Sequence, residues 1–137
     1  MLINLHANVE NDGVLQLNIP RLTFDQRFNY KIGITHVNYR TSRGTLFTDN
    51  ELLCINTNVI DLSVQNPTQS LLHFPFNAKR TIQNIRPSIV LYQSLQLYEF
   101  ENASFELRRF HSNELVKINS IFIQLEIIRL DAYGRLQ

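Results

Sequence analysis

The stretch from 121 to 128 limits what this chain can fold into more than any other part of the sequence. Aliphatic residues recur at every second position from Ile121 to Ile127, and Gln124 and Glu126 stand between them. Side chains of a β-strand alternate between two faces, so this pattern predicts a strand with one buried face. Around a helix axis the same residues would scatter and bury no continuous surface. Phe122 falls on the polar side of the strand, so we expect its ring to face outward.

Turn residues divide much of the remaining chain into short segments of the same kind. The predicted strands are 3–9, 14–19, 30–39, 52–55, 59–64, 71–76, 89–92, 95–100, 105–110, 115–118 and the closing strand from 121. Their spacing is typical of a sandwich or barrel, and no segment has helical spacing. The sequence therefore predicts an all-β protein, an antiparallel β-sandwich, folded as a single jelly roll of about eight strands. We expect one domain, 1–137, in which 131–137 is a polar tail.

Three local patterns refine this expectation. Between Tyr30 and Tyr39 the apolar residues change face midway, which predicts either a strand covered on both sides or a β-bulge. Pro75 has no backbone N–H, so the segment 71–76 is expected at a sheet edge or to end there. The polar residues His111 to Glu114 separate two apolar segments and predict a hairpin turn. Residues 78–87 are expected to form a loop.

Composition excludes several classes of function. The net charge of the chain is +1, which argues against nucleic acid as its main ligand. Asn and Gln are abundant, and three Lys stand against ten Arg. This composition fits intersubunit contacts, where Lys is depleted and Arg enriched, and fits equally the codon drift of an A/T-rich genome. The single cysteine, Cys54, rules out an internal disulfide and lies in an apolar run that predicts a buried side chain.

No arrangement of residues points to a reaction. The four histidines are far apart and none has a metal-ligand spacing, so we predict no metal and no cofactor. No serine has the Gly-x-Ser-x-Gly context of a hydrolase nucleophile. The close carboxylate pairs at 49/51 and 99/101 are better explained as solvated strand edges than as a hydrolytic pair. We predict no catalytic residue, no small-molecule substrate and no enzymatic activity.

Aromatic and basic residues supply candidates for contacts with other protein chains. Outward-facing aromatic rings and arginines are the side chains that protein interfaces favour, although any single ring can instead belong to the core. The interface candidates are Phe122, Phe47, Tyr92, Tyr98, Arg40 and Arg43. We expect the arginines, Arg108 and Arg109 among them, to pair with carboxylates across such an interface.

The N-terminal residues give an expectation about where the protein is made. Residues 1–6 already alternate as a strand and lack the charged start and apolar core of a signal peptide. No window approaches the length of apolar sequence that a membrane span needs. We therefore expect synthesis in the cytosol and no contact with a membrane.

Two blocks of this sequence resemble a known family. The first is 15–39, which ends in Tyr30-Lys31-Ile32-Gly33-Ile34-Thr35-His36-Val37-Asn38-Tyr39. The second is 52–61, followed by 103–110 and the strand 121–127. In the same order they are similar to small jelly-roll capsid proteins of Polinton/Maverick-type and adintovirus-like DNA viruses. The resemblance implies a non-enzymatic virion protein of the penton or minor-capsid kind, which assembles with copies of itself and with other capsid proteins.

Three functional hypotheses follow. The first is a self-assembling structural protein, the capsid component that the resemblance implies. The second is a β-sandwich that binds a carbohydrate or protein receptor through an exposed face or loops. The third is a cupin-like enzyme, which would need the clustered His and carboxylate ligands that the sequence does not supply.

Overall fold

The structure, a computed structural model, is an all-β sandwich of antiparallel strands, which confirms the predicted fold class. It describes residues 1–8, 14–15, 24–25, 27–40, 51–60, 70–76, 82–95, 104–116, 119–131 and 133–136. Within these residues there are nine strands and no helix. The strands are β1 (Leu2–Asn8), β2 (Val14–Leu15), β3 (Asn29–Arg40), β4 (Leu52–Thr57), β5 (Ser70–Pro75), β6 (Ile82–Ile85), β7 (Gln93–Ser94), β8 (Phe105–Arg109) and β9 (Ser120–Leu130).

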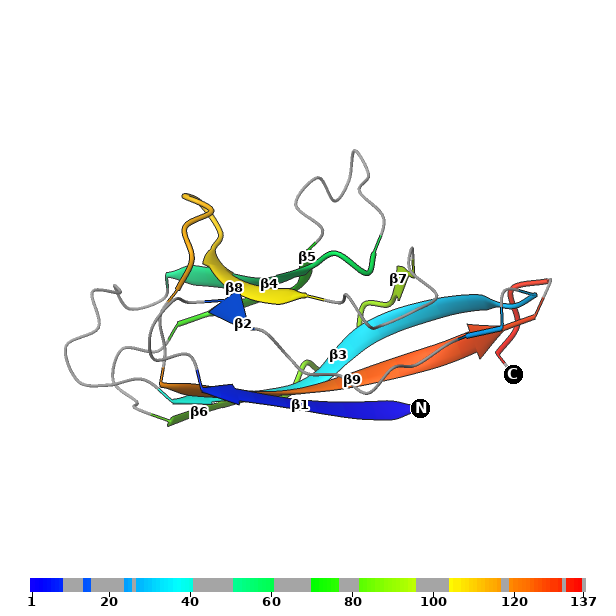
Figure 1. Ribbon diagram of the computed structural model, residues 1–137, viewed down its shortest axis with the longest axis horizontal. Helices are drawn as coiled ribbons and strands as arrows, with labels where there is room; N and C mark the ends of the chain where they lie inside the picture. The colour runs from blue at the N-terminus through cyan, green and yellow to red at the C-terminus, as the bar shows by residue number, and fades with distance from the viewer. Residues whose placement is uncertain are drawn as a thin grey trace.

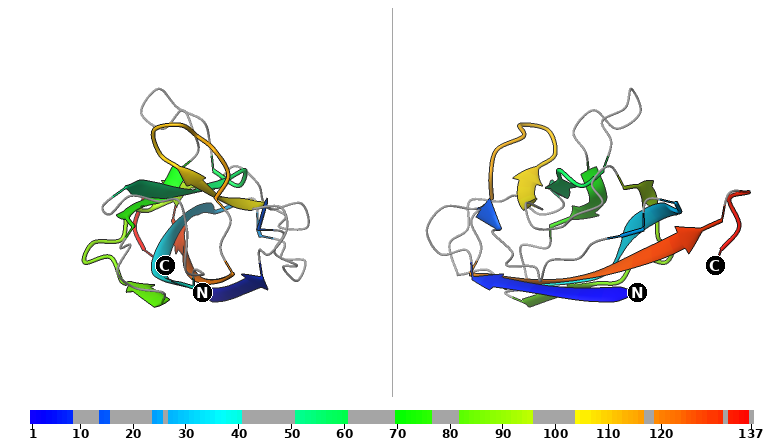
Figure 2. Two further views of the ribbon diagram at one scale, coloured as in Figure 1. Left: turned by 90° about the vertical axis from the view of Figure 1, so that its left-hand side faces the viewer. Right: turned by 45° about the vertical axis from the view of Figure 1, so that its right-hand side comes forward.

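The strands form two sheets, and every strand pairing is antiparallel. The first sheet has the order β1-β9-β3-β6, and β7 pairs with β3 beside β6. The second sheet has the order β2-β8-β4-β5. Figure 1 shows the first sheet as the lower layer and the second as the upper layer, and Figure 2 shows the same layers from two other sides.

The strand pairs are nested along the sequence. β4 pairs with β5 at the centre, β3 pairs with β6 outside it, β2 pairs with β8 next, and β1 pairs with β9 outermost. Successive pairs belong alternately to the second and the first sheet. The chain therefore runs as one long hairpin whose two arms cross together from sheet to sheet.

The core lies between the two layers and follows from alternation along the strands. In β9 the residues Ile121, Ile123, Leu125 and Ile127 are all buried, as their spacing predicts, and the residues between them are half-buried. Cys54 is also buried, as expected. The largest fully buried side chains are Tyr39, Phe74, Phe76, Phe105, Ile32, Ile34, Leu53, Ile55, Ile60 and Leu107.

A β-bulge accounts for the change of face within β3. Ile34 lies opposite Leu125 and His36 opposite Gln124, so Thr35 is an extra residue in the pairing. The bulge keeps apolar residues before and after it on the buried side. Of the two predicted explanations, the bulge is correct.

Two predictions next to the β3 edge are wrong. Residues 89–92 were expected to be a strand, but the strand that follows is β7, and β6 lies in the predicted loop 78–87. Four residues of β3, 33–36, lie opposite seven residues, 86–92, so the second chain must leave the sheet between β6 and β7. Pairing with β3 sets the positions of β6 and β7. That pairing cannot be recognised from the sequence pattern of 82–94 alone.

The predicted edge position of 71–76 and the predicted hairpin turn at 111–114 are both confirmed. β5 ends at Pro75 and pairs only with β4 among the described residues. In the turn, the N–H of Asn113 donates to the carbonyl of Arg109 at 2.9 Å, and Asn113 has a φ of 58°. Of the strand predicted after the turn, the described residues 115 and 116 both join β8: Leu115 bridges to Arg108, and the N–H of Val116 donates to the carbonyl of Leu107 at 2.9 Å. The predicted strand stretches 16–19, 61–64, 96–100 and 117–118 lie outside the described residues.

Candidate interface on the outward sheet face

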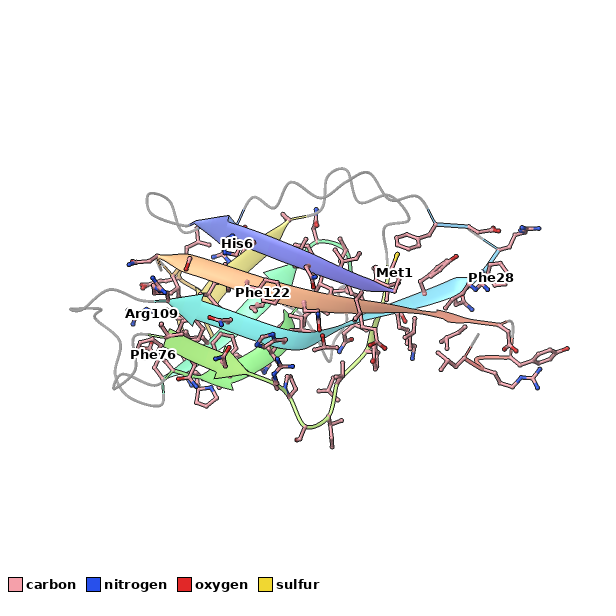
Figure 3. The ribbon with its side chains drawn as sticks, turned by 90° about the horizontal axis from the view of Figure 1, so that it is seen from below. Met1, His6, Phe28, Phe76, Arg109 and Phe122 are labelled. Atoms are coloured by element: carbon pink, nitrogen blue, oxygen red, sulfur yellow. The ribbon has the colours of Figure 1, made fainter. Side chains whose placement is uncertain are left out.

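The outward side of the first sheet carries a group of uncharged polar side chains around one aromatic ring. The strand register places them in two rows across the sheet. One row is His6, Phe122, Asn38 and Asn84; the other is Asn4, Gln124 and His36. We call these seven residues the outward face. Figure 3 looks onto this side of the sheet, with His6 on β1 and Phe122 on β9.

Hydrogen bonds join neighbouring amides within the outward face. Asn38 Nδ2 donates to Asn84 Oδ1 at 2.7 Å, and the same oxygen lies 3.3 Å from His36 Nε2. Gln124 Nε2 donates to Asn4 Oδ1 at 3.1 Å. The hydroxyl of Thr35, the bulge residue, donates to Gln124 Oε1 at 2.9 Å. These bonds orient the amides and leave part of their hydrogen-bonding capacity directed at whatever meets the face.

Phe122 is the apolar centre of this arrangement. Its side chain is half-buried, on the opposite side of β9 from the fully buried Ile121 and Ile123, so its predicted outward direction is confirmed. His6 lies beside it in the register on one strand, and the ring of His36 meets it edge-on from the other strand at a centroid distance of 5.6 Å. The contact role of Phe122 stays a prediction.

Arg40 stands at the margin of the outward face. It ends β3, lies opposite Ser120 and Ile82, and its side chain is exposed. Ile82 is also 47% exposed, so an apolar side chain and a cation lie together at this margin. Such a mixed rim around an aromatic centre is common at protein interfaces.

Tyr92 lies at the other end of the outward face and makes its contacts within the chain. Its hydroxyl donates to Glu126 Oε1 at 2.9 Å. Burial, and then the bond to Glu126 and its negative charge, raise the pKa of Tyr92 above its ordinary value. Between them on β3 stands Gly33, where an added Cβ would lie 2.5 Å from Val90 Cγ1 and 3.0 Å from Tyr92 Cδ1. Tyr92 therefore has a structural role, in addition to the contact role predicted for it.

Three other candidates, Phe47, Tyr98 and Arg43, lie outside the described residues. The structure therefore brings Phe122, Arg40 and Tyr92 to one side of one sheet. The amides around Phe122 and the close contact at Gly33 were not among the predicted site residues. For Gly33 a signal was present, since a glycine inside a strand marks a close approach. The amides come together only through the strand register.

The seven residues of the outward face include no Asp, Glu, Lys or Arg, and the nearest charged residues named above, Arg40 and Glu126, lie at its two ends. Arg109 forms an ion pair with Glu51 at 2.9 Å and Arg108 with Glu106 at 2.7 Å, both on the second sheet. These arginines thus pair within the chain, whereas pairing across an interface was expected. Since burying neutral amides costs less than burying charges, the outward face can be covered at low electrostatic cost.

The described residues contain no group of three or more His, Cys, Asp or Glu placed to hold a metal ion. The described part of the chain is built of strands and turns, and it holds no helix that could span a membrane. In comparisons with known proteins, no family model, no curated protein and no solved structure matches the chain.

Proposed function

We propose that this protein is a structural, non-enzymatic subunit of a virion shell, a single jelly-roll capsid component of the penton or minor-capsid kind. The observation that carries the proposal is the nested pairing of the strands. Eight of the nine described strands form two four-stranded sheets whose pairing follows a rolled-up hairpin, and this pairing supports a jelly roll. β7 adds a short pairing on the margin of β3. Since a fold by itself does not set a function, the step to a capsid role also uses the resemblance of the two sequence blocks.

The outward face is the surface that we assign to contacts between subunits. Phe122 supplies an aromatic anchor at its centre, and His6, Asn38 and Gln124 supply uncharged polar neighbours. Arg40 stands at the rim. An aromatic centre with few charges and a polar rim is the usual make-up of a specific protein interface.

The mass of the protein in solution tests self-assembly. We expect size-exclusion chromatography with light scattering to give a mass that is a multiple of the 16.1 kDa chain. Electron microscopy of the same fractions should show closed, symmetric particles or rings. A stable monomer at high protein concentration would contradict the proposal.

The same face favours one second candidate, a sandwich that binds a neutral carbohydrate. Sugar rings stack on aromatic side chains, and their hydroxyls bond to amide groups, which here surround Phe122. A glycan array distinguishes the two candidates. Hits on uncharged glycans that disappear in Phe122→Ala would favour this function; an array without hits would remove it.

A further inference from the structure

A groove of about 590 Å³ lies at one side of the sandwich, between the margins of the two sheets. Four consecutive residues of β5, 70–73, form one wall. The segment that leaves the sheet between β6 and β7 forms the other wall through Pro87, Ser88, Ile89 and Leu91. Its volume is within the range of about 300–1,000 Å³ common for ligand sites.

The β5 wall presents the edge of a strand. The groove touches four consecutive residues of this strand, and the pairing with β4 is irregular here: Ile55 lies opposite Leu72 and Asn56 opposite Ser70, so Leu71 is the extra residue of a β-bulge. Among the described residues β5 pairs only with β4, on its other side. Backbone groups of Leu71 to His73 on the groove side are therefore placed to pair with a further strand.

The opposite wall is apolar and reaches into solvent. Ile89 is 75% exposed and Leu91 is 68% exposed, and both line the groove. Among the residues that the structure describes, those lining the groove include no Asp, Glu, Lys or Arg. His73 is their one titratable side chain; burial lowers its pKa, which favours the neutral imidazole, and its ring lies 4.7 Å from that of Phe110. The walls therefore suit an uncharged occupant with apolar side chains.

We propose that this groove binds an extended, uncharged peptide segment of another protein chain, which adds to β5 as a further strand. The backbone of the peptide pairs with Leu71 to His73, and its alternate apolar side chains pack against Ile89 and Leu91. This is strand addition, in which the main chain supplies affinity and side-chain sites supply specificity. A second copy of the sandwich fits less well, because its own 86–92 segment would have to enter the same space. The inference goes beyond self-assembly and does not depend on it.

A short, end-blocked peptide of alternating valine and threonine, labelled with fluorescein, is the probe. We expect a saturable rise in fluorescence anisotropy with the full chain, and slower amide hydrogen exchange at 71–73 when the peptide is bound. Leu91→Lys should weaken binding about tenfold or more, since Leu91 supplies apolar area in the groove. The same peptide N-methylated at every second residue should not bind, because it lacks the donors that pair with β5.

Tyr133→Lys is the matched control, since Tyr133 is an exposed apolar side chain outside the groove. It should bind the peptide as the wild type does. No saturable binding, equal affinity in Leu91→Lys, or binding without slower exchange at 71–73 would overturn the proposal. A dimer that Leu91→Lys dissociates would also overturn it, because the occupant would then be a second copy. The peptide-binding and hydrogen-exchange results do not bear on assembly through the outward face.

Discussion

At the scale of single residues, Gly33 allows the segment 90–92 to pack against one end of the first sheet. Its missing side chain lets Val90 and Tyr92 lie against β3, and Tyr92 can then reach Glu126 on the next strand. A glycine usually weakens a strand, so a glycine between Ile32 and Ile34 indicates that the space is occupied by another part of the chain.

Gly33→Ala should therefore destabilise the protein. The new Cβ would lie 2.5 Å from Val90 Cγ1, and a branched side chain can give way only by moving its backbone or changing rotamer. We expect a loss of about 1–3 kcal/mol in the free energy of unfolding, measured by urea denaturation. Ser94→Ala, at an exposed position of β7, is the control and should unfold as the wild type does. An unchanged midpoint in Gly33→Ala would show that 90–92 does not lie against β3.

The pH dependence of stability tests the contact between Tyr92 and Glu126. The folded protein holds the phenol proton to higher pH than the unfolded chain does, because the pKa of Tyr92 is raised. This contribution is complete below the ordinary value of 10.0 and is lost as the pH rises through the raised pKa. Tyr92→Phe should lower stability by about 1 kcal/mol at neutral pH and flatten the fall above pH 10. An equal loss of stability at high pH in the wild type and in Tyr92→Phe would contradict the contact between Tyr92 and Glu126.

At the scale of strands, the bulge in β3 joins the core to the outward face. Thr35 is the extra residue, and its hydroxyl lies 3.2 Å from the backbone oxygen of Gln124 and 2.9 Å from its Oε1. It thereby supports the register that puts His36 opposite Gln124 after the bulge.

Thr35→Val removes this hydroxyl and keeps the shape of the side chain. We expect it to lower the free energy of unfolding by about 1 kcal/mol, since a partly buried amide loses a partner. Thr35→Ser keeps the hydroxyl and should recover most of the loss. Full stability in Thr35→Val together with a loss in Thr35→Ser, measured by chemical denaturation, would mean that the methyl group and not the hydroxyl stabilises the bulge.

A strand can be predicted from the sequence when its own residues carry the pattern of burial, and cannot when its position is set by pairing with another strand. β9 and the bulged β3 carry their own patterns, because one face of each is buried along its whole length. Pro75 likewise marks the end of β5 by its own chemistry. β6 and β7 have too few residues to show a period, and β3 defines their positions. The outward face could not be predicted either, since it exists only once the register has brought Asn38, Asn84 and Phe122 into one row.

At the scale of the whole molecule, charge and shape divide the surface into regions with different roles. The second sheet carries the ion pairs of Arg108 and Arg109 within the chain. The first sheet presents the uncharged outward face, and the groove beside β5 opens at the side where the two sheets meet. The proposed contacts between subunits and the proposed peptide site therefore use separate surfaces, so that each can be changed without the other.

The most direct test of self-assembly through the outward face is sedimentation velocity of Asn84→Asp. The new carboxylate would keep the oxygen that accepts from Asn38 and His36, so the fold is retained while a negative charge enters the face. Asn113→Asp, the same change in the exposed turn after β8, is the control. We predict oligomers for the wild type and the control, and a shift of Asn84→Asp to the 16.1 kDa monomer. A wild-type monomer, or oligomers of Asn84→Asp as stable as those of the control, would contradict this account.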